Sequence, residues 1–140
     1  MKVCIRKLAL RDYHQVMALW RSCEGIGLTD ADSREGIRSF LRRNPGLSFV
    51  AVMNGRVVGS ALCGHDGRRG FIYHLAVAPL TRRKGIGRAL ANRCLSGLRS
   101  IGIEKCHIVV YRRNQAGRRF WANAGWVERT ELTLMSKLSR

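Results

Sequence analysis

The sequence predicts an α+β domain with a mixed, mostly antiparallel sheet of about seven strands, flanked by about four helices. Residues 48–78 hold three β-type runs in succession, joined by Asn54-Gly55 and Asp66-Gly67, which are strong hairpin signals. A strand–helix–strand pattern over residues 70–111 adds a parallel pair with a right-handed crossover. The 140 residues, 46% of them hydrophobic and 25% charged, suit one folded domain over residues 1–140.

One strand and two helices are predicted ahead of this run. Residues 3–7 form a short strand, and apolar side chains at helical spacing predict a helix over 11–23. A Gly-Ile-Gly run ends this helix. Asp32 or Ser33 is placed to cap a second helix, which ends near the Asn-Pro-Gly run at 44–46.

The hairpin strands are predicted at 48–53, 56–64 and 70–78, and a long amphipathic helix follows at 83–100. The next run, 105–111, is rich in β-branched residues and is therefore expected to be a strand.

The last part of the chain predicts one helix and two strands. Asn114 can cap a short helix over 115–123. Closing strands are predicted at 126–129 and 130–138, where leucines alternate with polar residues.

The formal net charge is +17, which implies an anionic partner such as a phosphorylated cofactor, nucleic acid or an acidic surface. An Arg-rich genome is the competing explanation. Four of the nine acids, Glu24, Asp30, Asp32 and Glu35, fall within twelve positions and make a local acidic segment. No helix-turn-helix, zinc or aromatic RNA-binding signature is recognised, so nucleic acid is not expected as a direct substrate.

The cysteines and the opening residues indicate a cytoplasmic protein. The five cysteines are an odd number without Cys-x-x-Cys spacing, which argues against a disulfide framework and a metal cluster. Most of them are expected to be small buried hydrophobic residues. The first residues become charged too soon for a signal peptide, and no run is long enough to span a membrane.

Residues 75–90 carry the clearest chemical signal: a strand ends, a basic glycine-containing loop follows, and an amphipathic helix begins. This arrangement directs backbone N–H groups and the positive end of the helix dipole toward one point, and glycine lets an anion approach the backbone. A dinucleotide fingerprint is excluded because Leu90 stands where its third glycine belongs, and the Gly-Lys-Ser/Thr of a Walker A loop is missing. The predicted diphosphate site consists of Arg82, Arg83, Lys84, Gly85, Ile86, Gly87 and Arg88.

This segment resembles the central motif of the GNAT superfamily of acyl-CoA N-acyltransferases. The matching residues are Leu75-x-Val77-x-Pro79-x-x-Arg82-x-x-Gly85-Ile86-Gly87. Asn114 and Phe120-Trp121-x-x-x-Gly125-Trp126 resemble the second motif of the family. The order of predicted elements is similar to the GNAT fold over nearly all 140 residues, and Gly64-x-Asp66-Gly67-x-Arg69-Gly70 is similar to the YpeA-type branch.

The resemblance implies an N-acetyltransferase that moves the acetyl group of acetyl-CoA directly to a primary amine, on a small molecule or a protein N-terminus. It implies neither an acyl-enzyme nor a metal. The strand ending at Leu75, Ala76 and Val77 would splay from its neighbour and pair with the pantetheine arm. The N–H of Leu75 would hold the developing oxyanion, and Asn114 would touch the pantetheine.

The acid and the base depart from the family pattern. The family's general acid is a tyrosine, and Trp121, whose indole N–H is no usable acid, stands at that position. Tyr111 and Tyr73 are candidates to replace it, and unassisted departure of the thiolate is the alternative. For the base, strand alternation puts Phe71 and Tyr73 on the catalytic face and His74 on the other, unless a bulge reverses this. Tyr73 is therefore favoured as the base over His74.

A weakly basic amine is the expected acceptor. Deprotonating a lysine amine at neutral pH costs roughly 4–5 kcal/mol, whereas an α-amine costs about 1.4 kcal/mol. Glu24 and Asp30, together with Tyr73, would border the acceptor site that the resemblance implies.

Three other functions stay open. One is a non-catalytic acyl-CoA-binding protein, suggested by Trp121. The second is an acetyltransferase acting on a ribosomal or other nucleic-acid-associated protein, and the third is a nucleic-acid-binding protein. The expected partners are acetyl-CoA and an unidentified amine, with a homodimer as a further option.

Overall fold

The structure is a computed structural model that describes residues 2–140, and these form two compact units. The first unit extends to Val109 and the second spans Val110–Arg140. The first unit contains the sheet and three α-helices, and the second contains the last helix, α4 (Gln115–Asn123). Among the described residues, no helix is long and apolar enough to cross a lipid bilayer.

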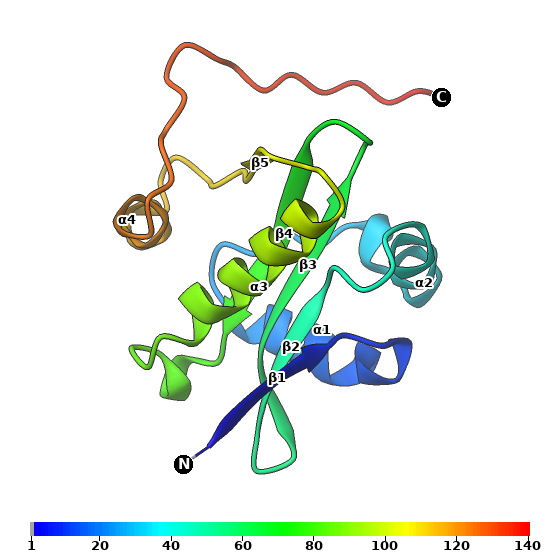
Figure 1. The fold of residues 1–140 in the computed structure, drawn as a ribbon, viewed down its shortest axis with the longest axis vertical. Coiled ribbons are helices and arrows are strands. Elements are labelled where there is room, and N and C mark those ends of the chain that lie inside the picture. The colour runs from blue at the N-terminus through cyan, green and yellow to red at the C-terminus, as the bar shows by residue number, and fades with distance from the viewer. Residues whose placement is uncertain (1) are drawn as a thin grey trace. The chain divides into compact units, whose positions relative to one another are not determined.

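The sheet of the first unit is mixed and mostly antiparallel, as predicted (Figure 1). Neighbouring strands follow the order of the chain, and the first four pair antiparallel. The fifth strand pairs parallel with the fourth, which confirms the predicted strand–helix–strand unit. The strands are β1 (Val3–Lys7), β2 (Phe49–Met53), β3 (Arg56–His65), β4 (Gly70–Val77) and β5 (Cys106–His107).

Both hairpin turns use the residues that predicted them. Asn54 and Gly55 have φ angles of 52° and 75°, so both adopt the left-handed conformation that a tight two-residue hairpin needs. In the β3–β4 turn, Asp66 accepts hydrogen bonds from the backbone N–H groups of Arg68 and Arg69, both at 2.8 Å. These hydrogen bonds hold the pKa of Asp66 below its usual range. Asp66 therefore serves the turn.

Helices cover the two faces of the sheet (Figure 1). α1 (Tyr13–Ser22) and α2 (Arg34–Arg43) pack on one face, and α3 (Ile86–Ser100) packs on the other. Ser33 caps α2, because its Oγ accepts a hydrogen bond of 3.0 Å from the N–H of Gly36. Three short 3-10 turns precede the helices: η1 (Leu10–Asp12), η2 (Asp30–Asp32) and η3 (Pro79–Thr81).

The core lies on both faces of the central strands. Trp20 of α1 and Ile37 of α2 are buried against Val50, Leu62 and Ala76 of the sheet. On the other face, two strand glycines let α3 approach closely. A Cβ on Gly59 would lie 3.0 Å from Leu90, and one on Gly70 would lie 2.5 Å from Leu98. This close packing holds α3 against β3 and β4.

The prediction of about seven strands is wrong, because the sheet has five. β5 has two residues rather than the predicted seven, and no strand is assigned anywhere in residues 108–140. The alternating Leu132 and Leu134 of the predicted closing strand are exposed. A pattern of alternation becomes a strand only where a neighbour supplies a hydrogen-bonded ladder, and residues 126–138 have no strand partner.

An ion pair between β1 and the start of α1 contributes to the stability of the first unit. Arg6 donates two hydrogen bonds, of 2.9 and 2.8 Å, to the carboxylate of Asp12, which is 3% exposed. These bonds are the main reason why the pKa of Asp12 is lowered. The backbone N–H of Ala9 supplies a third hydrogen bond of 2.9 Å.

We expect Asp12→Ala to lower the free energy of unfolding at neutral pH by about 1–2 kcal/mol, since Arg6 stays partly solvated. Because the pKa of Asp12 is lower in the folded protein than in the unfolded chain, its ionised carboxylate stabilises the fold at pH values above the unfolded-state pKa of about 3.9. This contribution is lost as the pH falls through the folded-state pKa. Urea unfolding of both proteins from pH 7 to pH 3 should show the difference shrinking at the acid end. A difference that stays constant down to pH 3 would contradict this assignment.

Candidate active site

The loop between β4 and α3 has the backbone shape of an anion site. Arg83 and Gly85 have φ angles of 65° and 78°, so the chain turns twice through the left-handed region before the helix. Alternation of this kind points successive N–H groups inward and forms an anion-binding concavity. Gly85 is the N-cap residue of α3, and no side chain caps the helix there. A helix start without a side-chain cap is the kind of helix end at which an anion binds.

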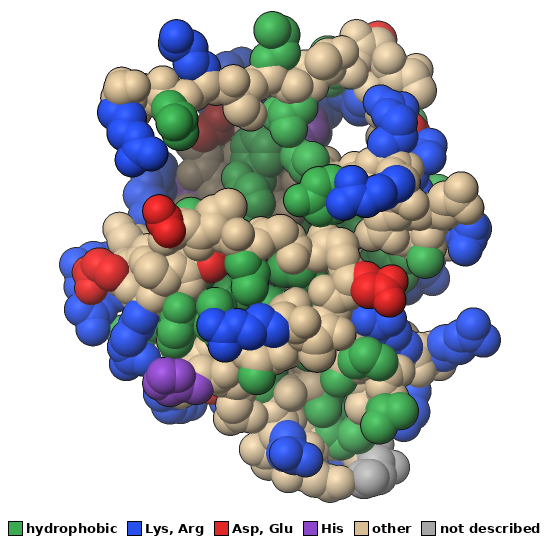
Figure 2. Space-filling view, turned by 180° about the vertical axis from the view of Figure 1, so that it is seen from behind, with side chains coloured by type: hydrophobic (Ala, Val, Ile, Leu, Met, Phe, Trp, Pro, Cys, Tyr) green, Lys and Arg blue, Asp and Glu red, His purple; other side chains and the backbone are tan. Residues whose placement is uncertain are grey.

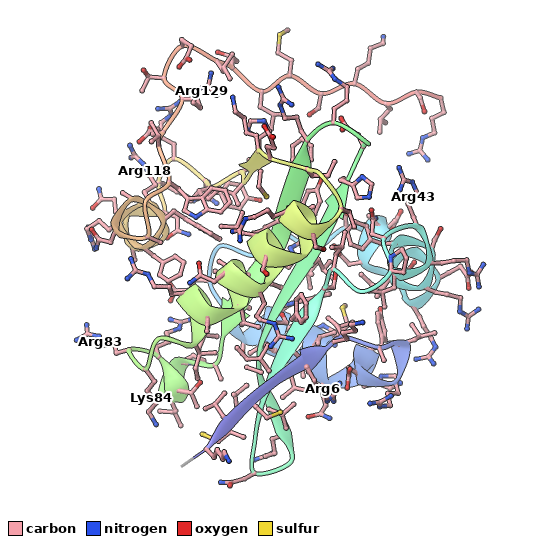
Figure 3. All side chains as sticks on the ribbon, in the orientation of Figure 1. Arg6, Arg43, Arg83, Lys84, Arg118 and Arg129 are labelled. Atoms are coloured by element: carbon pink, nitrogen blue, oxygen red, sulfur yellow. The ribbon has the colours of Figure 1, made fainter. Side chains whose placement is uncertain are left out.

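Basic side chains surround this loop. Arg82, Arg83 and Lys84 are all exposed, and Figure 3 shows Arg83 and Lys84 on the loop that leads into α3. Arg82 is anchored by its Nε, which donates a 3.0 Å hydrogen bond to the carbonyl of Val77. Guanidinium and ammonium groups placed beside the N-terminus of a helix suit a phosphate or diphosphate.

The edge of β4 beyond its first residues is open. β5 pairs with β4 only at Gly70 and Phe71, so the stretch from Tyr73 to Val77 has no parallel neighbour within the first unit. On the other edge, Ser60 pairs with Ala76 and Leu62 pairs with Tyr73, so a single β3 residue faces two residues of β4. Those two residues, His74 and Leu75, form a β-bulge outside the regular ladder.

The bulge places Tyr73 and His74 on the same face of the sheet, contrary to the alternation expected from the sequence. The Tyr73 ring lies edge-on to Phe40 of α2, with centroids 6.1 Å apart. The His74 ring lies 4.8 Å from that of Trp20 of α1. His74 reaches this face because its φ angle is 50°, a left-handed value that is uncommon outside glycine.

Tyr73 sits in an aromatic row with Phe71, whose ring stacks on it at 6.0 Å. Burial raises the pKa of the Tyr73 hydroxyl above its usual value of 10.0. The phenol therefore keeps its proton at neutral pH and is better suited to donating a proton than to accepting one.

His74 and Asp32 form a hydrogen-bonded pair that the sequence did not reveal. The Nε2 of His74 lies 2.7 Å from Oδ1 of Asp32, and both side chains are largely buried, at 17% and 7% exposure. The two residues are 42 positions apart, and no motif or spacing connects them. Only the combination of the β4 bulge and the η2 turn brings them together.

The acidic segment does not form one cluster. Asp32 is buried against His74, and Glu35 is exposed and paired with Arg38 at 3.1 Å. Glu24 and Asp30, the predicted acceptor-binding acids, are exposed. Their place at an acceptor site therefore stays a prediction.

The second unit holds the other predicted site residues. Asn114 caps α4, since its Oδ1 accepts a 3.0 Å hydrogen bond from the N–H of Gly117. Trp121 lies edge-on to Phe120 and Trp126, with ring centroids 5.1 and 4.9 Å away. The Tyr111 ring is covered by the guanidinium of Arg113 at 4.7 Å. Roles for Asn114, Trp121 and Tyr111 in the reaction stay predictions.

The cysteines are mostly buried, as expected. Cys23, Cys63 and Cys94 are buried, Cys106 is partly buried and Cys4 is exposed. A hydrogen bond with Cys63, together with burial, raises the pKa of Cys94 far above its usual value. Burial raises the pKa of Cys106 to about 12. Thiols of this kind are poor nucleophiles at neutral pH.

Comparison with known protein families gives a match over most of the chain. Residues 13–126 match the model of the acetyltransferase (GNAT) family. An acetyltransferase of Pectobacterium atrosepticum is 37% identical over 112 residues, which are 80% of this chain and 79% of the relative. An acetyltransferase of Yersinia pseudotuberculosis is 36% identical over the same length and shares. The YpeA-type branch stays a prediction.

Solved structures show the same fold. The PaiA N-acetyltransferase of Thermoplasma acidophilum in complex with coenzyme A has a TM-score of 0.80 at 21% identity, covering 89% of each chain. The ribosomal-protein-S18-alanine N-acetyltransferase of Escherichia coli has a TM-score of 0.77 at 21% identity, covering 92% of this chain and 80% of that one. From the family match and the relatives, the chain belongs to the acetyltransferase (GNAT) family and is an acyl-CoA-dependent acetyltransferase.

Proposed function

We propose that the protein transfers the acetyl group of acetyl-CoA directly to a primary amine while both substrates are bound. The observation that carries this proposal is the loop before α3, where left-handed Arg83 and Gly85 leave the first N–H groups of the helix without a side-chain cap. A diphosphate fits that arrangement of donors and positive charge.

The open edge of β4 supports the rest of the cofactor site. Residues Leu75 to Val77 lie beyond the end of the β4–β5 pairing. We propose that their backbone pairs with the pantetheine arm. The N–H of Leu75, at the bulge, is the proposed donor to the oxyanion that develops when the amine attacks. Asn114 is proposed to contact the pantetheine. Tyr73, whose raised pKa keeps it protonated, is proposed to donate the proton to the departing sulfur.

The proposed acceptor is a weakly basic primary amine, such as an α-amine. Such an amine loses its proton for about 1.4 kcal/mol near neutral pH, against roughly 4–5 kcal/mol for a lysine side chain. We propose that the carboxylates of Glu24 and Asp30 attract the positive charge of this amine. One neighbour in fold is named for acetylating the alanine of a ribosomal protein, which is an α-amine of this kind.

An acetyltransferase that binds acyl-CoA but catalyses transfer only slowly is the second candidate, and Trp121 is the observation that favours it. This residue stands where the family motif has its proton-donating tyrosine, and its ring is packed between Phe120 and Trp126.

Release of free thiol from acetyl-CoA, measured with a panel of amines, separates the two candidates. The panel contains an alanine-terminated peptide, alaninamide, 1,4-diaminobutane and hydroxylamine. We expect turnover with at least one α-amine and slower turnover with the diamine. Binding of acetyl-CoA with only slow turnover of every amine would favour the second candidate instead.

A further inference from the structure

Asp32, the partner of His74, is held by several hydrogen bonds besides the one to the imidazole. Oδ1 of Asp32 meets Nε2 of His74 at 2.7 Å, while Oδ2 accepts a 3.0 Å hydrogen bond from the backbone N–H of Thr29. The backbone carbonyl of Asp32 accepts a 2.7 Å hydrogen bond from the hydroxyl of Tyr13. The carboxylate is therefore fixed on both oxygens, and its orientation toward the imidazole is set.

This arrangement determines which ring nitrogen of His74 can accept a proton. A carboxylate only accepts hydrogen bonds, so Nε2 must carry the hydrogen in the pair. Nδ1 is then the ring nitrogen whose lone pair can take up a proton. Trp20 is the neutral group that packs against the ring, with centroids 4.8 Å apart, while the hydroxyl of Ser60 lies 3.4 Å from the backbone carbonyl of His74. Asp32 is the charged group that contacts the ring.

The position of His74 in the chain connects it to the reaction. It precedes Leu75, the proposed oxyanion donor, in the same β-bulge. Its φ angle of 50° turns the side chain onto the face that carries Tyr73. A left-handed backbone at a non-glycine residue is a strained arrangement of the kind found at functional sites.

We propose that His74 is the general base of the acetyl transfer and that Asp32 is the residue that positions it. This proposal rests on the proposed function. Nδ1 of His74 takes one proton from the cationic amine and later passes it to water. The lone pair thus freed forms the C–N bond, and the C–S bonding pair leaves with sulfur. The second proton lost by the attacking nitrogen ends on that sulfur, so amide, free thiol and one proton are the products.

If His74 is the base, its loss must slow the reaction much more for an amine that is protonated at the assay pH than for one that is already unprotonated. We choose His74→Asn because asparagine tolerates a left-handed backbone and its amide cannot take up a proton. For alaninamide at pH 7, we expect kcat to fall about 100- to 10,000-fold. For hydroxylamine, which is already unprotonated at this pH, we expect a fall of less than about tenfold. His14→Asn, on the exposed face of α1, is the matched control and should leave both rates unchanged.

Asp32→Asn tests the positioning role. Its amide oxygen is expected to keep the hydrogen bond from Thr29, which turns the NH₂ group toward Nε2 and forces the ring hydrogen onto Nδ1. We expect the same selective loss with alaninamide as in His74→Asn, and no further loss in the double variant. Nitrogen NMR of the histidine rings is a readout independent of activity. It should show His74 with hydrogen on Nε2 in the unaltered protein and on Nδ1 in Asp32→Asn.

The outcomes separate the possible failures. Equal losses with alaninamide and hydroxylamine, together with reduced thermal stability, would show that the pair is purely structural and would overturn the proposal. Hydrogen on Nδ1 in the unaltered protein would overturn it as well. Unchanged turnover in His74→Asn would show that His74 is not the base, and the proposed function would be unaffected. Failure of the unaltered protein with every amine would overturn both.

Discussion

Reversing two charges in the loop before α3 is expected to weaken coenzyme A binding about 100-fold, or about 2.7 kcal/mol. The variant is Arg83→Glu with Lys84→Glu. Both side chains are exposed, so the fold should persist, and both adjoin the left-handed turn that precedes the helix. Two attractive charges become repulsive toward a diphosphate, and salt should reduce the difference because these charges are not buried. Titration calorimetry with coenzyme A at low and moderate salt measures the effect.

The control for this variant is Arg99→Glu with Lys105→Glu, which reverses the same number of charges. Arg99 is exposed in the last turn of the same helix, about 20 Å away along the helix, and Lys105 is exposed beyond the end of that helix. We expect less than a threefold change in affinity. Equal weakening by both variants would mean that binding responds to total charge rather than to the loop.

Trp20→Ala is expected to have the largest effect on stability, lowering the free energy of unfolding by about 3–5 kcal/mol. The side chain is 1% exposed and lies in the core between α1 and the sheet. Its Nε1 donates a 2.8 Å hydrogen bond to Oγ of Ser60, and its ring packs against His74. Truncation would leave a cavity beneath the β-bulge. Urea unfolding, followed by circular dichroism, measures the loss.

Trp20→Phe separates packing from hydrogen bonding. It keeps an aromatic ring but removes the donor to Ser60, whose hydroxyl lies 3.4 Å from the His74 carbonyl. We expect a smaller loss, of about 1–3 kcal/mol. A loss below 1 kcal/mol for Trp20→Ala would show that this part of the core is less tightly packed than the structure indicates.

The shape of the loop before α3 was predictable because it depends on local rules. Gly85 has a left-handed backbone with a φ of 78°, which glycine adopts readily. The apolar residues of the following helix repeat at helical spacing. Hairpins were predictable for the same reason, since Asn54 and Gly55 determine their own turn. The high positive charge was a weaker guide. In Figure 2, Lys and Arg side chains are scattered over the visible face rather than gathered in one patch.

Features that depend on contacts between distant segments were not predictable. Strict alternation placed His74 on the wrong face, because a bulge opposite β3 leaves no signal in the order of side chains. Asp32 was recognised as a helix cap or an acid of the acidic segment, yet Ser33 caps α2 and Asp32 binds a histidine 42 positions away. Alternation at Leu132 and Leu134 predicted a strand that has no ladder partner.

A crystal structure of the protein with coenzyme A tests the central claim most directly. We predict both phosphates of the diphosphate within hydrogen-bonding distance of backbone N–H groups between Arg83 and Arg88, with the pantetheine arm running along Leu75 to Val77. A diphosphate bound at another edge of the sheet, with the loop before α3 making no contact to it, would contradict the account.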